Sequence, residues 1–216
     1  MCAKANSLEG LFNMATRQQC MTKIKRYPAV SLSKLRPDSE AVLVPLCRVD
    51  GIPSILYTVR SQHLWYNKGE IAFPGGVNNK KETLIETALR HTEEDIGLKP
   101  DKIDIWGNGP AFPGRDNKIL VTPVIASVDR LTDADLNVNN KKVAEVFTVA
   151  IEVLCDPNNQ FASNCDGFLL PVFAADKYII RGLTAYITHV LLNCALSKDV
   201  YNNDILKRKK IMAPLK

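Results

Sequence analysis

The segment from Phe73 to Leu98 constrains the fold more than any other part of this 216-residue chain. It reads FPGGVNNKKETLIETALRHTEEDIGL, which predicts a strand end, a tight glycine turn, a polar loop and one amphipathic helix. Thr83 and Glu86 have the spacing of a capping box, which marks where the helix begins. Gly97 can adopt the left-handed conformation that ends a helix. The segment is therefore expected to hold one helix with well-defined ends.

One face of this helix is apolar, and the other face carries charge. At about 100° per residue, positions 91, 94 and 95 fall on one side of the helix. They hold His91, Glu94 and Asp95, and the two acids are expected to face away from the buried stripe. The stripe consists of residues at helical spacing, namely Leu84, Ile85, Ala88, Leu89, Thr92 and Ile96.

The two acids lie in the last turn, where the negative end of the helix dipole disfavours each by about 0.3–1 kcal/mol. A bound cation would offset this cost, and carboxylate oxygens suit Mg²⁺ or Mn²⁺. His91, Glu94 and Asp95 are therefore candidate metal ligands. Arg90 lies four residues from both Glu86 and Glu94 and is expected to pair with either. The alternative is a solvated charged face that binds no metal.

The order of glycine, acids and arginine resembles the Nudix box, G-x5-E-x7-R-E-U-x-E-E-x-G-U, in which U is aliphatic. The matching residues are Gly76, Glu82, Arg90, Glu94, Gly97 and Leu98. Asp95 keeps the charge of a box glutamate. His91 stands where the family has a glutamate that binds metal and sometimes acts as the base. The resemblance implies an α/β/α sandwich with a mixed sheet, and catalytic roles for Arg90, Glu94 and Asp95.

A second resemblance lies just ahead of the box. Nudix hydrolases that cleave coenzyme A carry the signature L-L-T-x-R-[SA]-x3-R-x3-G-x3-F-P-G-G. This chain matches it at Leu56, Thr58, Arg60, Ser61, Gly69 and Phe73 to Gly76, whereas Tyr57 and Trp65 depart from it. The substrate-binding residues that follow from this likeness are Arg60, Ser61, Gly69, Phe73, Gly75 and Gly76, and the nearby Lys68, Lys80 and Lys81 are further candidate phosphate contacts.

The likeness extends over about residues 40–197. The blocks AVLVPLC, ILVTPVIA, VAEVF and RGLTAYIT look like those of the mitochondrial coenzyme A diphosphatase branch of the family. Such relatives often have tryptophan where Arg181 stands and glutamate where Lys142 stands. The resemblance implies metal-dependent hydrolysis of coenzyme A or acyl-CoA to 3′,5′-ADP and 4′-phosphopantetheine, free or acylated.

Three questions about the chemistry stay open at this point. The base could be Glu145 or Glu82, or polarisation by the metal could suffice. The substrate could be another nucleoside diphosphate derivative, such as ADP-ribose or a dinucleotide. The protein could also bind a nucleotide or a partner without turnover, because His91 replaces a box glutamate.

The composition of the chain indicates which classes of molecule it binds. A net charge of +5 suits a small anionic ligand without requiring nucleic acid. The six cysteines form no C-x-x-C pair, which argues against a zinc site or a disulfide framework. No apolar run approaches the roughly 20 residues of a membrane span. We expect a monomer or a homodimer.

Apolar and β-branched runs predict strands at 41–49, 54–60, 70–73, 103–106, 119–126, 145–149, 168–173 and 178–180. Loops are predicted at 108–116 and 136–142, a helical turn at 151–154, and a closing helix at 184–196 that Thr184 caps. Mixed strands with two long helices predict an α/β sandwich. The domain is expected to span 37–197, with a basic N-terminal extension at 1–36 and a basic tail at 198–216.

The N-terminal extension is rich in basic residues and has one acid, Glu9. Leu8, Leu11, Phe12 and Ala15 can share one helical face. This pattern is typical of a mitochondrial presequence, and equally of an ordinary N-terminal helix packed on the domain. The first alternative predicts a mitochondrial location, and the second allows a cytoplasmic one.

Overall fold

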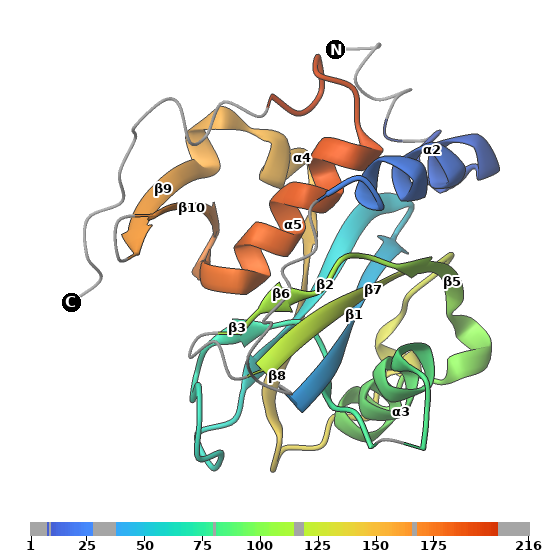
Figure 1. Ribbon diagram of the computed structural model, residues 1–216, viewed down its shortest axis with the longest axis vertical. Helices are drawn as coiled ribbons and strands as arrows, with labels where there is room; N and C mark the ends of the chain where they lie inside the picture. The colour runs from blue at the N-terminus through green and yellow to red at the C-terminus, as the bar shows by residue number, and fades with distance from the viewer. Residues whose placement is uncertain are drawn as a thin grey trace.

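A mixed eight-stranded sheet lies at the centre of the computed structural model, which describes residues 8, 10–27, 38–79, 81–114, 119–165 and 168–202. Helix α3 (Leu84–Ile96) covers one face of the sheet. Helices α2 (Met14–Ile24) and α5 (Gly182–Ala195) cover the other (Figure 1). This arrangement confirms the predicted α/β/α sandwich with a mixed sheet.

The large sheet has the strand order β3-β2-β1-β7-β5, with β4 beside β1, β6 beside β7 and β8 beside β2. Its strands are β1 (Asp38–Val49), β2 (Ile52–Arg60), β3 (Ile71–Ala72), β4 (Gly75–Val77), β5 (Asp104–Asn108), β6 (Phe112–Pro113), β7 (Ile119–Val128) and β8 (Val143–Ala150). A separate three-stranded sheet contains β9 (Gln160–Cys165), β10 (Phe168–Ala175) and β11 (Tyr178–Ile180). The remaining elements are α4 (Ile151–Cys155) and four 3₁₀ turns at Gly10–Phe12, Pro100–Lys102, Asp133–Asp135 and Pro157–Asn159.

Strand β1 organises the sheet, because it pairs with β2, β4 and β7 and its side chains enter two cores. Ala41 and Leu43 pack on the face of α3, whereas Val44 and Leu46 pack on the face of α2 and α5. This alternation follows from the two-residue period of a strand. Full burial of a leucine stabilises the fold by about 1.5–3 kcal/mol, so β1 anchors both layers.

The second half of the chain differs from expectation in three places. Strand β6 lies inside the predicted loop at 108–116, and β9 was not predicted because its residues, QFASNC, mix polar and small side chains. Thr184 does not cap the last helix, which begins at Gly182 after Arg181. The Thr184 hydroxyl instead donates a hydrogen bond to the Ile71 carbonyl at 3.0 Å, which ties α5 to β3.

Helix α2 belongs to the N-terminal segment and packs on the domain. The Asn13 side chain caps it by accepting from the Thr16 amide, and Cys20 and Ile24 are buried in the core shared with α5. The described part of this segment therefore folds as an ordinary helix packed on the domain. Most of the predicted tail, from residue 203 onward, lies outside the described residues, as do residues 1–7 and 28–37.

Each helix in the described ranges is too short or too polar to cross a membrane. Cys20, Cys47, Cys155 and Cys194 form no disulfide bond within the described residues.

Candidate functional site

Helix α3 has the ends that its sequence predicts. The Thr83 hydroxyl accepts from the Glu86 amide at 3.2 Å, and Glu86 Oε2 accepts from the Thr83 amide at 2.7 Å, so the capping box is complete. Gly97 ends the helix in the left-handed conformation, with φ at 73°. Residues close in sequence fix both ends of the helix. The position of its charged face against neighbouring elements is therefore fixed as well.

The glycines before the helix form strand β4, so the predicted tight turn is wrong. Gly76 pairs with Ala41 of β1, and the Val77 carbonyl faces α3. Glycine has low strand propensity, which hides this strand from sequence patterns. A Cβ at position 76 would lie 2.7 Å from the His91 ring, so the close approach of strand and helix requires glycine there.

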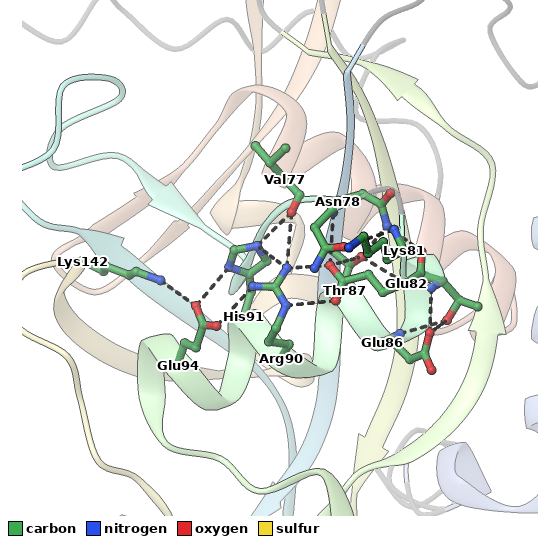
Figure 2. A network of polar contacts seen from close by, with 12 residues as sticks. Val77, Asn78, Lys81, Glu82, Glu86, Thr87, Arg90, His91, Glu94 and Lys142 are labelled. Carbon is green, nitrogen blue, oxygen red and sulfur yellow. Dashed lines mark hydrogen bonds and ion pairs between the residues drawn. The ribbon is translucent and has the colours of Figure 1, made fainter.

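Arg90 joins two acids that lie on either side of it in the sequence (Figure 2). Its Nε lies 3.0 Å from Glu82 Oε2 and one terminal nitrogen lies 2.6 Å from Oε1, a bidentate contact. The other terminal nitrogen lies 3.1 Å from Glu94 Oε1. The expected pairing with Glu94 is therefore confirmed. Pairing with Glu86 is not seen, because Glu86 is engaged in the capping box.

Glu82 is held by neighbours that its sequence context did not reveal. The Thr87 hydroxyl donates to Glu82 Oε1 at 3.1 Å, and Asn78 Nδ2 donates to the Glu82 carbonyl at 3.0 Å. The hydrogen bonds from Arg90 lower the pKa of Glu82 to about 2. A carboxylate with so low a pKa is a weak base. Glu82 thus fits a positioning role for Arg90 better than a role as general base.

Glu94 and Asp95 share one cation, the ammonium of Lys142. Lys142 Nζ lies 3.0 Å from Glu94 Oε2 and 3.0 Å from Asp95 Oδ1. Asp95 is buried, with 7% of its surface exposed, so the expectation that it faces away from the core is wrong. It lies between the apolar stripe and the charged face, at the helix end where the loop before β8 packs. Sequence reasoning missed the contact with Lys142 because the residue lies on that distant loop.

His91 lies between β4 and Glu94. Its Nε2 is 3.1 Å from the Val77 carbonyl oxygen, and its Nδ1 is 3.7 Å from Glu94 Oε2. A carbonyl only accepts hydrogen bonds and an arginine only donates them, so Nε2 carries a proton in its contact with Val77 and lacks one in its contact with Arg90, whose terminal nitrogen lies 3.3 Å away. Nδ1 is the ring nitrogen that faces the acids.

A divalent cation does not fit these residues as they are arranged. Glu94 and Asp95 have the donor chemistry for a hard cation, but Lys142 occupies the place that both acids share. His91 brings a neutral or positive ring where a third acid would be needed. Across the described ranges, no group of three or more His, Cys, Asp or Glu residues could hold a metal ion.

The predicted substrate-binding residues ahead of the box fall into two groups. Arg60 ends β2, and Ser61 starts the following loop with its amide donating to the Lys142 carbonyl at 2.9 Å. Lys68 and Gly69 are exposed further along this loop, and the Gly69 amide returns to the Arg60 carbonyl at 3.0 Å. The loop therefore begins beside the contact between α3 and Lys142.

The contacts of Phe73 and Gly75 indicate that both residues have structural roles. Phe73 is buried and stacks on Tyr57 with ring centroids 5.1 Å apart, so its side chain belongs to the core. A Cβ at Gly75 would collide with the Ala41 carbonyl and lie 2.6 Å from Val42 Cα, so this glycine is required for β4 to approach β1. Lys81 is exposed, and Lys80 lies outside the described residues.

Glu145 lies apart from the box acids. Its Oε1 accepts from the Tyr178 hydroxyl at 2.6 Å and from Lys177 Nζ at 2.9 Å. It shares a strand face with Phe147, which packs in the core on the side of α5, opposite α3. The hydrogen bonds from Lys177 and Tyr178 lower the pKa of Glu145. Its role as a base stays a prediction, and the structure gives it other partners.

The sequence from residue 37 to residue 165 matches the family model described as the NUDIX domain, which covers more than half of the chain. The chain belongs to the Nudix family. Nudix hydrolases generally use divalent metal ions, so the lysine between the two box acids of this Nudix chain is a departure from that pattern.

Curated relatives resemble this Nudix chain over most of its length. Mitochondrial coenzyme A diphosphatase NUDT8 of Mus musculus is 39% identical over 182 residues, covering 81% of this chain and 85% of that protein. The Homo sapiens protein of the same name is 38% identical over 172 residues, covering 76% and 72%. Nudix hydrolase 3 of Caenorhabditis elegans is 33% identical over 218 residues, covering 90% of each chain.

Proposed function

We propose that this protein hydrolyses the diphosphate bond of coenzyme A or acyl-CoA, giving 3′,5′-ADP and 4′-phosphopantetheine, free or acylated. The observation that carries the proposal is the 39% identity, over 81% of the chain, with a protein named as a coenzyme A diphosphatase. The pre-box residues, from Leu56 to Gly76, add support because most of them follow the coenzyme A signature at its full spacing.

The loop after β2 supplies the positive charge that such a substrate needs. A diphosphate must be neutralised before water can attack phosphorus. Arg60 and Lys68 lie on this loop or at its start, and the Ser61 amide joins it to Lys142. The Nε of Arg60 is buried and has no hydrogen-bond partner among the described residues, and a terminal nitrogen of the same side chain lies 3.4 Å from the Tyr66 carbonyl oxygen. We propose that Arg60 binds a phosphate oxygen and that the loop orients the nucleotide.

Mg²⁺ or Mn²⁺ stays our prediction for the cofactor. Glu94, Asp95 and His91 are the residues assigned to it from sequence, and Lys142 opposes that assignment in the observed arrangement. The divalent ion is therefore a variable in the experiment below.

A second candidate function is binding without turnover. The observation that favours it is the ion pair of Lys142 with both Glu94 and Asp95, which neutralises the acids that a catalytic metal would need. Under this candidate the protein binds coenzyme A with the same loop and releases it unchanged.

One panel separates the two candidates. The purified protein is incubated with coenzyme A, acetyl-CoA, ADP-ribose, a dinucleotide and ATP, each with Mg²⁺, with Mn²⁺ and with a chelator, and products are identified by mass. Cleavage of coenzyme A ahead of the other substrates supports hydrolysis. Calorimetric binding of coenzyme A without products supports the second candidate. Cleavage of ADP-ribose with coenzyme A untouched would contradict both.

We also propose a mitochondrial location, supported by the names of the mouse and human relatives. Imaging of the full chain with a C-terminal tag tests it against the cytoplasmic alternative. Sedimentation of the purified protein tests whether it is a monomer or a homodimer.

A further inference from the structure

The ammonium of Lys142 lies where the sequence places a metal ion. Its Nζ is 3.0 Å from an oxygen of Glu94 and 3.0 Å from an oxygen of Asp95, and Figure 2 shows it approaching Glu94 from the loop opposite α3. A divalent cation that bridged the two acids would need the same place. We infer that Lys142 is the resident cation of this site and competes with Mg²⁺ or Mn²⁺ for Glu94 and Asp95. The inference rests on the proposed function only in that it concerns the same site.

The backbone holds Lys142 in this place from two sides. The Asn139 amide donates to the Asp95 carbonyl at 2.9 Å, and the Lys142 amide donates to the Asn139 carbonyl at 2.8 Å. On the other side, the Ser61 amide donates to the Lys142 carbonyl at 2.9 Å. The turn is thus fastened both to the end of α3 and to the end of β2. Because its anchor is fixed, the lysine reaches the acids from a defined direction.

The negative charge of Glu94 is already balanced by neighbouring cations. Glu94 Oε1 contacts Arg90 at 3.1 Å and Oε2 contacts Lys142 at 3.0 Å, so each oxygen has a cationic neighbour. A metal ion must therefore displace a charged ammonium.

Mn²⁺ titration followed by electron paramagnetic resonance tests the inference without substrate. The wild type is compared with Lys142→Gln, which keeps a polar side chain, one atom shorter, and removes the charge. Lys99→Gln is the matched control, because Lys99 Nζ pairs with Glu93 of the same helix at 2.6 Å. We expect Lys142→Gln to bind Mn²⁺ about tenfold to a hundredfold more tightly than wild type, the usual range for altered neighbours of metal ligands. Lys99→Gln should bind like wild type.

Two further variants keep the test decisive if Lys142→Gln is unstable. Lys142→Arg keeps the charge and should bind Mn²⁺ as weakly as wild type. Addition of Glu94→Gln to Lys142→Gln should abolish the gain, which locates the ion at this site. In thermal unfolding, Mn²⁺ should raise the Tm of Lys142→Gln more than that of wild type, because a ligand that binds the folded state stabilises it.

Equal Mn²⁺ affinity in wild type and Lys142→Gln would overturn the inference. A gain in affinity that survives Glu94→Gln would overturn it as well. Neither result depends on whether coenzyme A is cleaved, so failure of the proposed function and failure of this inference are distinguishable.

Discussion

The His91 ring lies directly against Gly76, so that a Cβ added to the glycine would be 2.7 Å from the ring. The two residues belong to different elements, α3 and β4, which the Val77 carbonyl also connects through its contact with His91 Nε2. The space available to the imidazole is therefore set by the glycine strand.

Gly76→Ala should displace His91 while the fold persists, because the ring can move away from the new methyl group. Gly75→Ala should be far more damaging, since its Cβ would meet the backbone of Ala41 and Val42. Overpacking of this kind costs about 1–3 kcal/mol where side chains can adjust and more where they cannot. Urea unfolding of both variants tests this order. Equal losses of stability in the two variants would mean that β4 can shift away from β1 to accommodate the added methyl group.

The Glu82 carboxylate should make stability depend on acid pH. Its pKa is lowered from 4.5 to about 2 in the folded protein, chiefly by hydrogen bonds from Arg90. A group with a lowered folded pKa stabilises the fold above its unfolded pKa, and this contribution is lost as pH falls from about 4.5 to about 2.

Glu82→Gln should therefore flatten the decline in Tm over that interval. Glu93→Gln, on helix α3, is the control, because Glu93 pairs with the exposed Lys99. An unchanged acid limb in Glu82→Gln would show that the ion pair with Arg90 is absent in solution.

The buried hydroxyls of Tyr57 and Thr188 should differ in their cost of removal. They lie 3.0 Å apart, and the Thr188 hydroxyl also donates to the Thr184 carbonyl at 2.9 Å. Tyr57 must then be the donor of the pair. Tyr57→Phe leaves Thr188 bonded and should cost about 1 kcal/mol, whereas Thr188→Val leaves a buried phenol unpaired and should cost about 1–3 kcal/mol. Denaturant unfolding measures both, and the reverse order would refute the assigned donor.

Arg60 should contribute to coenzyme A binding. Arg60→Gln removes a charged donor and should weaken binding about tenfold or more, the size of one charge-assisted hydrogen bond. Arg48→Gln is the control, because Arg48 pairs with Asp129 at the opposite end of the β1–β2 hairpin. Calorimetry measures both affinities. Equal losses in the two variants would point to general electrostatics instead of a defined contact.

Local signals predicted the box helix well, because the residues that start and stop it are neighbours in sequence. Thr83, Glu86 and Gly97 each act within a few residues of their partners. The contact of Lys142 with Glu94 could not be predicted this way, since it depends on how β8 joins β2 and how the preceding loop meets α3.

The same limit explains the other misjudged residues. Arg90 reaches Glu82 across the start of the helix, at a spacing of eight residues that helical periodicity does not cover. The strand at Gly75 and Gly76 exists only because β1 offers an edge to it. Contacts that depend on how the sheet assembles could therefore not be predicted from the sequence, whereas contacts within one helix could.

Strands β1 and β7 run parallel, and each residue from Asp38 to Cys47 meets a partner 81 positions later in the chain. Closing so long a loop costs entropy before its contacts form, so we expect this pairing to be a late step in folding. Helix α3 needs no such closure and emerges from the ribosome well before residue 142. The nascent chain therefore displays Glu94 and Asp95 before the lysine that contacts both of them has been made.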